Sequence, residues 1–244
     1  MDFTSPNVQY FFDLRNNQYF KKDDRNYINA LSIKQLNTLG NVSLLDIFLS
    51  KSNVVEPHIH QNASELVYCI SGAAVVSLIN PFTKKLVNIP ITPQQVANVP
   101  QGWWHYEIAT VDNTHILAIF DAPIPEFIGG SDLLRLTPAE IFAHTYCLNE
   151  EQVKATLAPI KDTVVIGPPA DCPKTVAAQH MPQMNAAHPN ANMVHPASVY
   201  PNANMPFHPY QGQTPSQGYM NRGGYPRQNI IGNGGQYIPG WPGN

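Results

Sequence analysis

Three histidines and one glutamate stand at spacings that suit a metal site. His58 and His60 are separated by one residue, Glu65 follows after a four-residue spacer, and His105 belongs to a later segment. Side chains alternate along a β-strand, so two histidines one residue apart on a strand point the same way. Three imidazoles and one carboxylate that converge on one point suit a divalent transition metal and leave coordination positions open for a ligand. The pattern therefore predicts a metal site that can also hold a small molecule.

The segments around these residues must place them on neighbouring strands. Short apolar or β-branched runs are separated by turn residues, among them Gly72, the Asn80-Pro81 pair and Pro93. The predicted strands cover residues 42–50, 65–70, 73–79, 96–99, 105–109 and 115–120. Many short strands with turns between them predict a mainly β fold, either a sandwich or a barrel.

Two turns stand close to the predicted ligands. Gly72 lies seven residues after Glu65, where a hairpin should turn. The run Pro100-Gln101-Gly102 predicts a second turn just before His105. These turns would bring the carboxylate and the third histidine back toward the first two.

Helical signals appear only after the predicted strands. Thr137-Pro138-Ala139-Glu140 offers an N-cap, a proline at the first helical position and a capping-box glutamate. Asn149 and the acidic residues after it open a second short helix in a similar way, and Pro159 follows its predicted end. A short helical extension is therefore expected behind the β domain.

Composition sets limits on location and partners. Charged residues make up 13% of the chain and the formal net charge is −3, without a basic stripe, which argues against nucleic-acid binding. The longest apolar runs are strand-length, so no membrane span is expected. The N-terminus lacks the basic start and apolar run of a secretory signal, and the three cysteines form an odd, small set. These features predict a cytoplasmic protein with reduced thiols.

The sequence changes character after residue 172. Every Asp and Glu lies at or before Asp171, and the rest of the chain is rich in Pro, Gly, Asn, Gln and Tyr. Such a composition buries too little apolar surface to offset chain entropy, so residues 173–244 are predicted to form a disordered tail. Two interpretations stay open: a solvated linker or adhesive extension, or a weak metal-binding or cross-linkable segment that uses its histidines or tyrosines. The histidines concerned are His180, His188, His195 and His208.

The two motifs resemble those of the cupin superfamily. Residues 57–72 match its first motif, with HxH, four residues, Glu, six residues and Gly, and residues 100–105 match PxGxxH. The similarity is greatest to the germin and oxalate-decarboxylase branch and extends over roughly residues 30–160. It implies a double-stranded β-helix, the cupin jelly-roll barrel, which usually holds manganese, with iron, nickel or zinc as alternatives. The ligands it implies are His58, His60, Glu65 and His105.

Resemblance and composition together divide the chain into four predicted parts. They are an N-terminal extension (1–30), a cupin barrel (31–125), a helical extension (126–172) and the tail (173–244).

Two departures from the oxalate-decarboxylase pattern bear on catalysis. The branch typically carries a substrate-binding arginine three positions before the first ligand histidine, and Val55 occupies that position here. A valine cannot form the bidentate pair with a carboxylate that arginine forms. The branch also uses a glutamate on a mobile lid as a proton donor. The best lid candidate is residues 121–128, with Glu126 as the acid or, alternatively, as a solvated loop carboxylate.

Strand parity adds candidates for the pocket. Glu107 lies two residues after His105 and should face the same interior, where a buried carboxylate could act as a general base or only accept a hydrogen bond. The same rule applied to Glu65 and His105 predicts three further pocket walls: Val67, Cys69 and Trp103.

Two functions lead at this point, with a sugar isomerase or a dioxygenase on another substrate as a further alternative, and the sequence does not decide whether the chain is an enzyme. The first is a metal-dependent enzyme on a small carboxylate, such as an oxalate decarboxylase or oxidase. The second is a non-catalytic, metal-stabilised protein that assembles through its helices and tail. A looser resemblance to cupins of spore-forming bacteria suggests the spore coat for the second. A homo-oligomer is expected for either.

Overall fold

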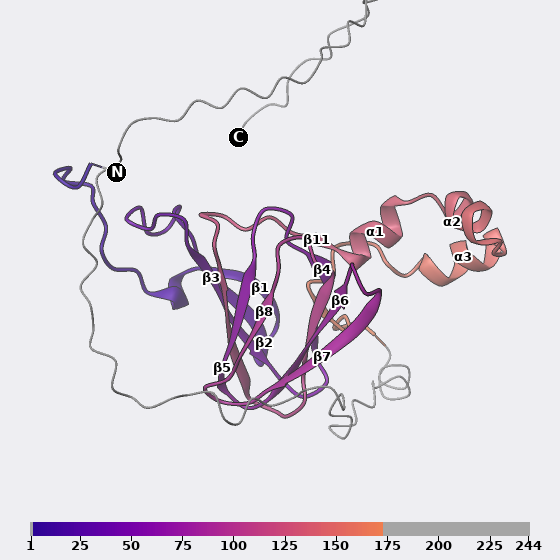
Figure 1. The fold of residues 1–244 in the computed structure, drawn as a ribbon, viewed down its shortest axis with the longest axis horizontal. Coiled ribbons are helices and arrows are strands. Elements are labelled where there is room, and N and C mark those ends of the chain that lie inside the picture. The colour runs from indigo at the N-terminus through magenta and orange to yellow at the C-terminus, as the bar shows by residue number, and fades with distance from the viewer. Residues whose placement is uncertain (1, 173–244) are drawn as a thin grey trace, which may run out of the picture. The chain divides into compact units, whose positions relative to one another are not determined.

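The computed structural model describes residues 2–172, so the predicted tail at 173–244 lies outside the described residues. Two six-stranded antiparallel sheets face each other (Figure 1). The first sheet has the order β1 (Gln18–Asp23), β2 (Asn26–Leu31), β3 (Ser43–Leu49), β10 (Thr114–Phe120), β5 (Glu65–Ser71) and β8 (Val96–Val99). The second has the order β11 (Ile128–Gly129), β4 (Val54–Ile59), β9 (His105–Ala109), β6 (Ala74–Asn80) and β7 (Lys85–Ile91), with β12 (Ile166–Gly167) paired to β4. This arrangement is a jelly-roll barrel, which confirms the predicted fold class.

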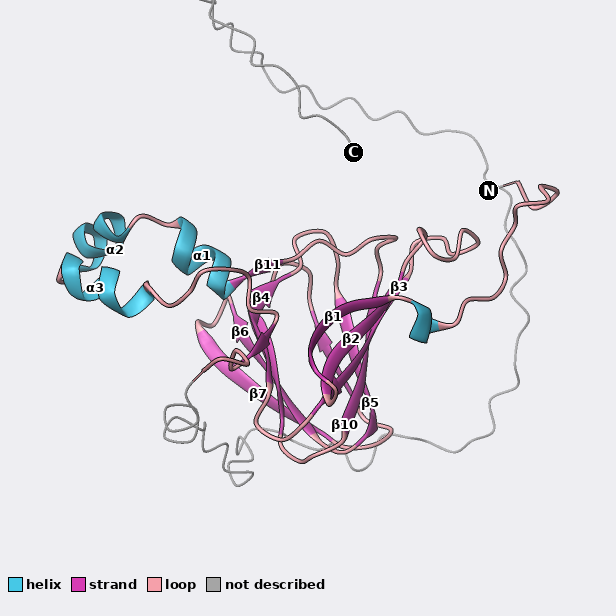
Figure 2. Cartoon of the chain, turned by 180° about the vertical axis from the view of Figure 1, so that it is seen from behind, coloured by secondary structure: helices cyan, strands magenta, loops and turns pink. Residues whose placement is uncertain are grey.

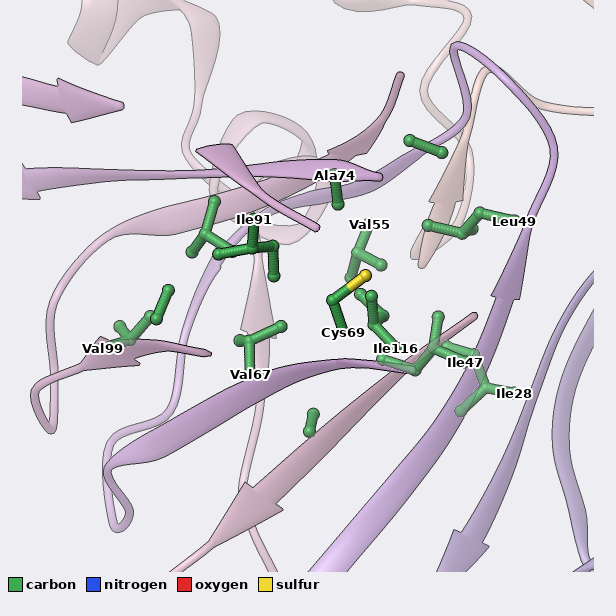
Figure 3. Close-up of a cluster of buried hydrophobic side chains, with 14 of the residues drawn as sticks. Ile28, Ile47, Leu49, Val55, Val67, Cys69, Ala74, Ile91, Val99 and Ile116 are labelled. Atoms are coloured by element: carbon green, nitrogen blue, oxygen red, sulfur yellow. The ribbon is translucent and has the colours of Figure 1, made fainter. Parts of the chain in front are cut away.

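Alternate side chains of each strand point into the space between the sheets. On β10, Ile116, Ala118 and Phe120 are buried, and the residues between them are partly exposed. Figure 3 shows Val67 and Cys69 gathered with other buried apolar side chains of this core. The core therefore joins the two sheets, as the period of two along each strand requires.

The six strands predicted from the sequence match β3, β5, β6, β8, β9 and β10 to within one residue at each end. β1 and β2 lie mostly within the predicted N-terminal extension, and β2 pairs with β3. β7 was also unpredicted. It pairs only with β6 among the described strands, and at such an edge Pro90 and exposed polar residues are tolerated, which hides the strand pattern.

Three short helices follow the barrel (Figure 2): α1 (Gly130–Leu136), α2 (Ala139–Tyr146) and α3 (Glu150–Leu157). The second predicted helix is confirmed as α3, where the Asn149 side chain caps the helix by accepting a hydrogen bond from the Gln152 amide at 2.9 Å. The predicted cap of α2 was wrong. Thr137 lies outside the helix, and Pro138 is the N-cap residue with no side chain to accept a hydrogen bond. Within residues 2–172, none of the helices has the length and apolar character needed to cross a bilayer.

Candidate metal centre

The four predicted ligands meet inside the barrel. His58 and His60 come from β4 and the residue after it, Glu65 from the start of β5, and His105 from the start of β9. One ligand atom from each residue lies within 4.8 Å of all the others. All four side chains are buried, with His60 the most exposed at 4%. The cluster therefore bridges the two sheets at a point that water scarcely reaches.

Main-chain oxygens determine which nitrogen of each ring carries a proton. Each Nδ1 lies 2.6–2.8 Å from a carbonyl oxygen: that of Glu56 for His58, of Glu126 for His60 and of Trp103 for His105. A carbonyl oxygen only accepts, so each Nδ1 donates, and Nε2 of a neutral ring carries a lone pair. The same backbone contacts hold the rings in place, as outer hydrogen bonds do for histidine ligands of metals.

The Nε2 atoms point at one another. Those of His58 and His60 lie 3.1 Å apart, and that of His105 lies 2.8 Å from Oε2 of Glu65. If both rings are neutral and both Nδ1 atoms donate, the lone pairs of the two Nε2 atoms face each other at 3.1 Å and repel. A cation bound by both nitrogens would remove this repulsion. This donor set of three imidazoles and a carboxylate fits a divalent transition metal.

A β-bulge aims the ligands. His58 of β4 is paired with His105 of β9, but the register shifts between Val55 and His58. Pro57 lies within the shift, at a position where a strand tolerates proline. The extra residue lets Val55 and His58 both be buried although they are three positions apart. Simple parity would put these two side chains on opposite faces.

Burial and the neighbouring charged groups shift the pKa values of Glu65 and His105 in opposite directions. Burial raises the pKa of Glu65, but hydrogen bonds from His105 and His60 outweigh it and hold that pKa well below the usual range. Burial lowers the pKa of His105, but its hydrogen bond to Glu65 and the charge of Glu107 outweigh that effect and raise the pKa to about 9. Burial and the neighbouring histidines lower the pKa of His58. Without a metal, one imidazolium therefore pairs with the Glu65 carboxylate.

Glu107 is the second carboxyl group of the interior. It is 1% exposed, and neither of its oxygens has a hydrogen-bond partner among the described residues. Burial and the charge of Glu65 raise its pKa to about 8. Its Oε1 lies 3.7 Å from Nε2 of His105. A buried polar group without a partner is rare in folded proteins, so the position suits a group that meets a ligand.

The predicted lid segment lies over the cluster. Asp121 accepts hydrogen bonds from the Ser64 amide at 2.8 Å and from its hydroxyl at 2.7 Å, and the Glu126 amide donates to Asn62 at 2.7 Å. The Phe127 ring lies 4.8 Å from that of His58, centroid to centroid. The Glu126 side chain is exposed. It is thus the main chain of Glu126 and the ring of Phe127 that contact the histidines.

A cavity of about 260 Å³ opens beside the cluster. It is lined by His58, His60, Glu65 and Glu107, and by Val55, the residue at the arginine position of the oxalate-decarboxylase pattern. Val67 and Cys69 are inward-facing as predicted, but they lie in the apolar core (Figure 3). Cys69 stands four residues from Glu65 along β5, a separation of about 13 Å in an extended strand. Trp103 is half-buried against the core, with its ring 6.2 Å from that of Phe82.

Glu56 is a residue of this site that sequence reasoning missed. Its carbonyl holds His58, and its buried carboxylate accepts hydrogen bonds from the Ser131 amide and hydroxyl and from the amides of Val164 and Val165, at 2.8–3.0 Å. It thereby joins β4 to the start of α1 and to residues 164–165. Nothing in the spacing of the motif signals this role.

Comparison with known proteins assigns the family. Residues 21–154 match the family model described as cupin, which covers more than half of the chain. The chain therefore belongs to the cupin family.

Relatives and solved structures agree with this assignment. The chain is 30% identical over 125 residues to germin-like protein 1-2 of Oryza sativa subsp. japonica, covering 49% of this chain and 55% of that protein. It is 30% identical over 145 residues to nectarin-1 of Nicotiana plumbaginifolia, covering 54% and 61%. It thus spans less than two thirds of these relatives. The structure of oxalate decarboxylase from Bacillus subtilis superimposes with a TM-score of 0.57 at 20% identity, covering 66% of this chain and 43% of that one, and shows the shared fold.

Proposed function

We propose that this cupin binds a divalent transition metal, manganese in the first place, and uses it to bind or transform a small carboxylate. One observation carries the proposal: three Nε2 atoms and the Glu65 carboxylate converge in a buried site, while every Nδ1 is already engaged by a carbonyl oxygen. Imidazole and carboxylate donors accept several metals, so iron, nickel or zinc would also fit. The likeness to germins and oxalate decarboxylase favours manganese.

A bound metal and the side chains around the cluster would have different roles. A bound metal would supply a Lewis acid that holds a carboxylate oxygen. Phe127 would limit the access of water. Glu107 would exchange a proton or a hydrogen bond with the ligand, because it is buried, borders the cavity and has no hydrogen-bond partner among the described residues. Glu126, with its exposed carboxylate, would take part only if its loop moved, so Glu107 is the favoured catalytic candidate.

A carboxylate-dependent change at the metal tests this function. The full chain is loaded with Mn(II), mixed with oxalate or other small carboxylates, and followed by paramagnetic resonance and by assays for carbon dioxide and hydrogen peroxide. We expect a changed manganese spectrum, with any turnover lost in His58→Ala. His144→Ala, altered at an exposed histidine of α2, should behave like the unmodified chain. Bound manganese that no carboxylate perturbs would contradict the proposal.

A second candidate is a metal-stabilised assembly protein without catalysis. The observation in its favour is the apolar surface of α1 and α2, where Leu133, Leu134, Leu136 and Ile141 are exposed. A second copy of the chain would bury such a surface. Light scattering on a variant with both Leu134→Lys and Leu136→Lys tests this candidate, because it measures the oligomeric state. A variant that keeps its metal but no longer forms an oligomer would support assembly through these helices.

The cytoplasmic location and the spore association stay predictions.

A further inference from the structure

The cavity beside the metal centre is larger than a minimal carboxylate requires. Its volume is about 260 Å³, close to the lower end of the roughly 300–1,000 Å³ found for pockets of drug-sized ligands. An ion that consists of two carboxylates alone, such as oxalate, would leave most of this space unfilled.

The lining of the cavity combines buried polar groups, buried apolar side chains and solvent-exposed residues. At the metal centre it is formed by buried His58 and Glu107. Other lining residues are apolar and buried, with Ile28 and Ile47 at 1–2% exposure and Val55 at 6%. Solvent-exposed members of the lining include Tyr19, at 60%, and Lys34. Apolar side chains therefore form much of the buried lining that accompanies the histidines.

The buried end of the cavity offers no cation for a second carboxylate. Among its described lining residues, Lys34 is the one lysine or arginine, and it is exposed. Glu65 and Glu107 contribute two carboxyl groups at the buried end instead. Val55 borders the cavity where an arginine would have supplied the missing charge. A buried carboxylate without a cation or hydrogen bonds is strongly disfavoured.

From this lining we infer that the site takes a monocarboxylate with a hydrocarbon body, its head group toward the metal centre and its body against Ile28, Ile47 and Val55. The inference rests on the proposed function and narrows its substrate class.

A chain-length series tests the inference on the unmodified full chain. Manganese-loaded protein is titrated by calorimetry with butanoate, hexanoate, octanoate and oxalate, and metal content is measured on the same samples. Octanoate should bind at least about tenfold more tightly than oxalate, and each added methylene should strengthen binding by about fourfold until the cavity is full. Manganese resonance spectra should change on addition of octanoate, which places the head group at the metal.

A matched substitution reverses the preference. Val55→Arg should strengthen oxalate binding and weaken octanoate binding, whereas Val55→Ala should weaken octanoate alone. If Val55→Arg does not fold, the chain-length series still decides. The inference would be overturned if metal-loaded protein bound oxalate more tightly than octanoate, or if affinity did not change with chain length. Either result would leave the proposed metal site unaffected. A chain that takes up no metal would overturn the proposed function and this inference with it.

Discussion

His105 and Glu65 form the pair of side chains that a metal must separate. In the metal-free protein, the hydrogen bond to Glu65 raises the pKa of His105 to about 9 against the effect of burial, so Nε2 holds a proton at neutral pH. A metal can bind Nε2 only after that proton leaves. Affinity for the metal should therefore rise by about tenfold per pH unit between about pH 6.5 and 8.5 and level off above pH 9. Calorimetry in two buffers of different ionisation enthalpy counts the released proton, and a pH-independent affinity would show that His105 is not a ligand.

Glu107 is expected to lower the stability of the metal-free fold. Its pKa rises from an ordinary 4.5 to about 8, mainly through burial, so its charged form is disfavoured in the folded state. The cost is absent below about pH 4, grows as the unfolded chain ionises and is complete above pH 8. Glu107→Gln should thus raise the free energy of unfolding by about 1–3 kcal/mol at pH 7 and leave it nearly unchanged at about pH 4.

Urea unfolding of metal-free protein at the two pH values measures this effect. Glu126→Gln is the matched control, because its side chain is exposed and should change stability by less than about 0.5 kcal/mol at either pH. A destabilised Glu107→Gln at pH 7 would mean that the Glu107 carboxylate has a favourable partner after all.

At the scale of elements, β11 and the start of α1 pack closely against β4, the strand that carries His58. Gly129 is paired with His58, and a Cβ at Gly129 would lie 2.6 Å from Oε1 of Glu56. Gly129→Ala should therefore disturb the hydrogen bonds of Glu56, lower the free energy of unfolding by about 2–4 kcal/mol and weaken metal binding.

Gly40→Ala provides the control for this substitution, since a Cβ there meets nothing within 4 Å. Urea unfolding and a metal titration on both variants make the comparison. Equal behaviour of the two would show that the contact between β11 and Glu56 does not support the site.

The elements that carry the motif could be predicted, and those that complete its surroundings could not. Alternating apolar residues and a two-residue histidine spacing indicated β5, β9 and the ligands. The bulge around Pro57 is set by pairing with β9, which lies far along the chain, so no local pattern reports it. β1 is an edge strand with a largely polar, exposed sequence, and in β2 the buried Asn26 and Asn29 interrupt the apolar pattern, so neither strand was predicted. The depth of Cys69 in the barrel depends on packing between both sheets, which parity along one strand does not give.

For the whole molecule, the four candidate ligands found among residues 2–172 all lie between positions 58 and 105, so we expect the tail to contribute nothing to the site. A chain shortened after Cys172 should bind manganese with a Kd within about twofold of the full chain. Competition with a chelator measures both values. A marked loss in the shortened chain would instead favour the interpretation in which the tail histidines bind metal.

Metal content is the measurement that tests the central claim most directly. The full chain, purified without an affinity tag, is analysed by elemental mass spectrometry beside His58→Ala and His144→Ala. We predict about one equivalent of manganese, or of another divalent transition metal, in the unmodified chain and in His144→Ala, and a near-complete loss in His58→Ala. A folded chain without metal, or equal metal in all three proteins, would contradict the account of the barrel as a metal site.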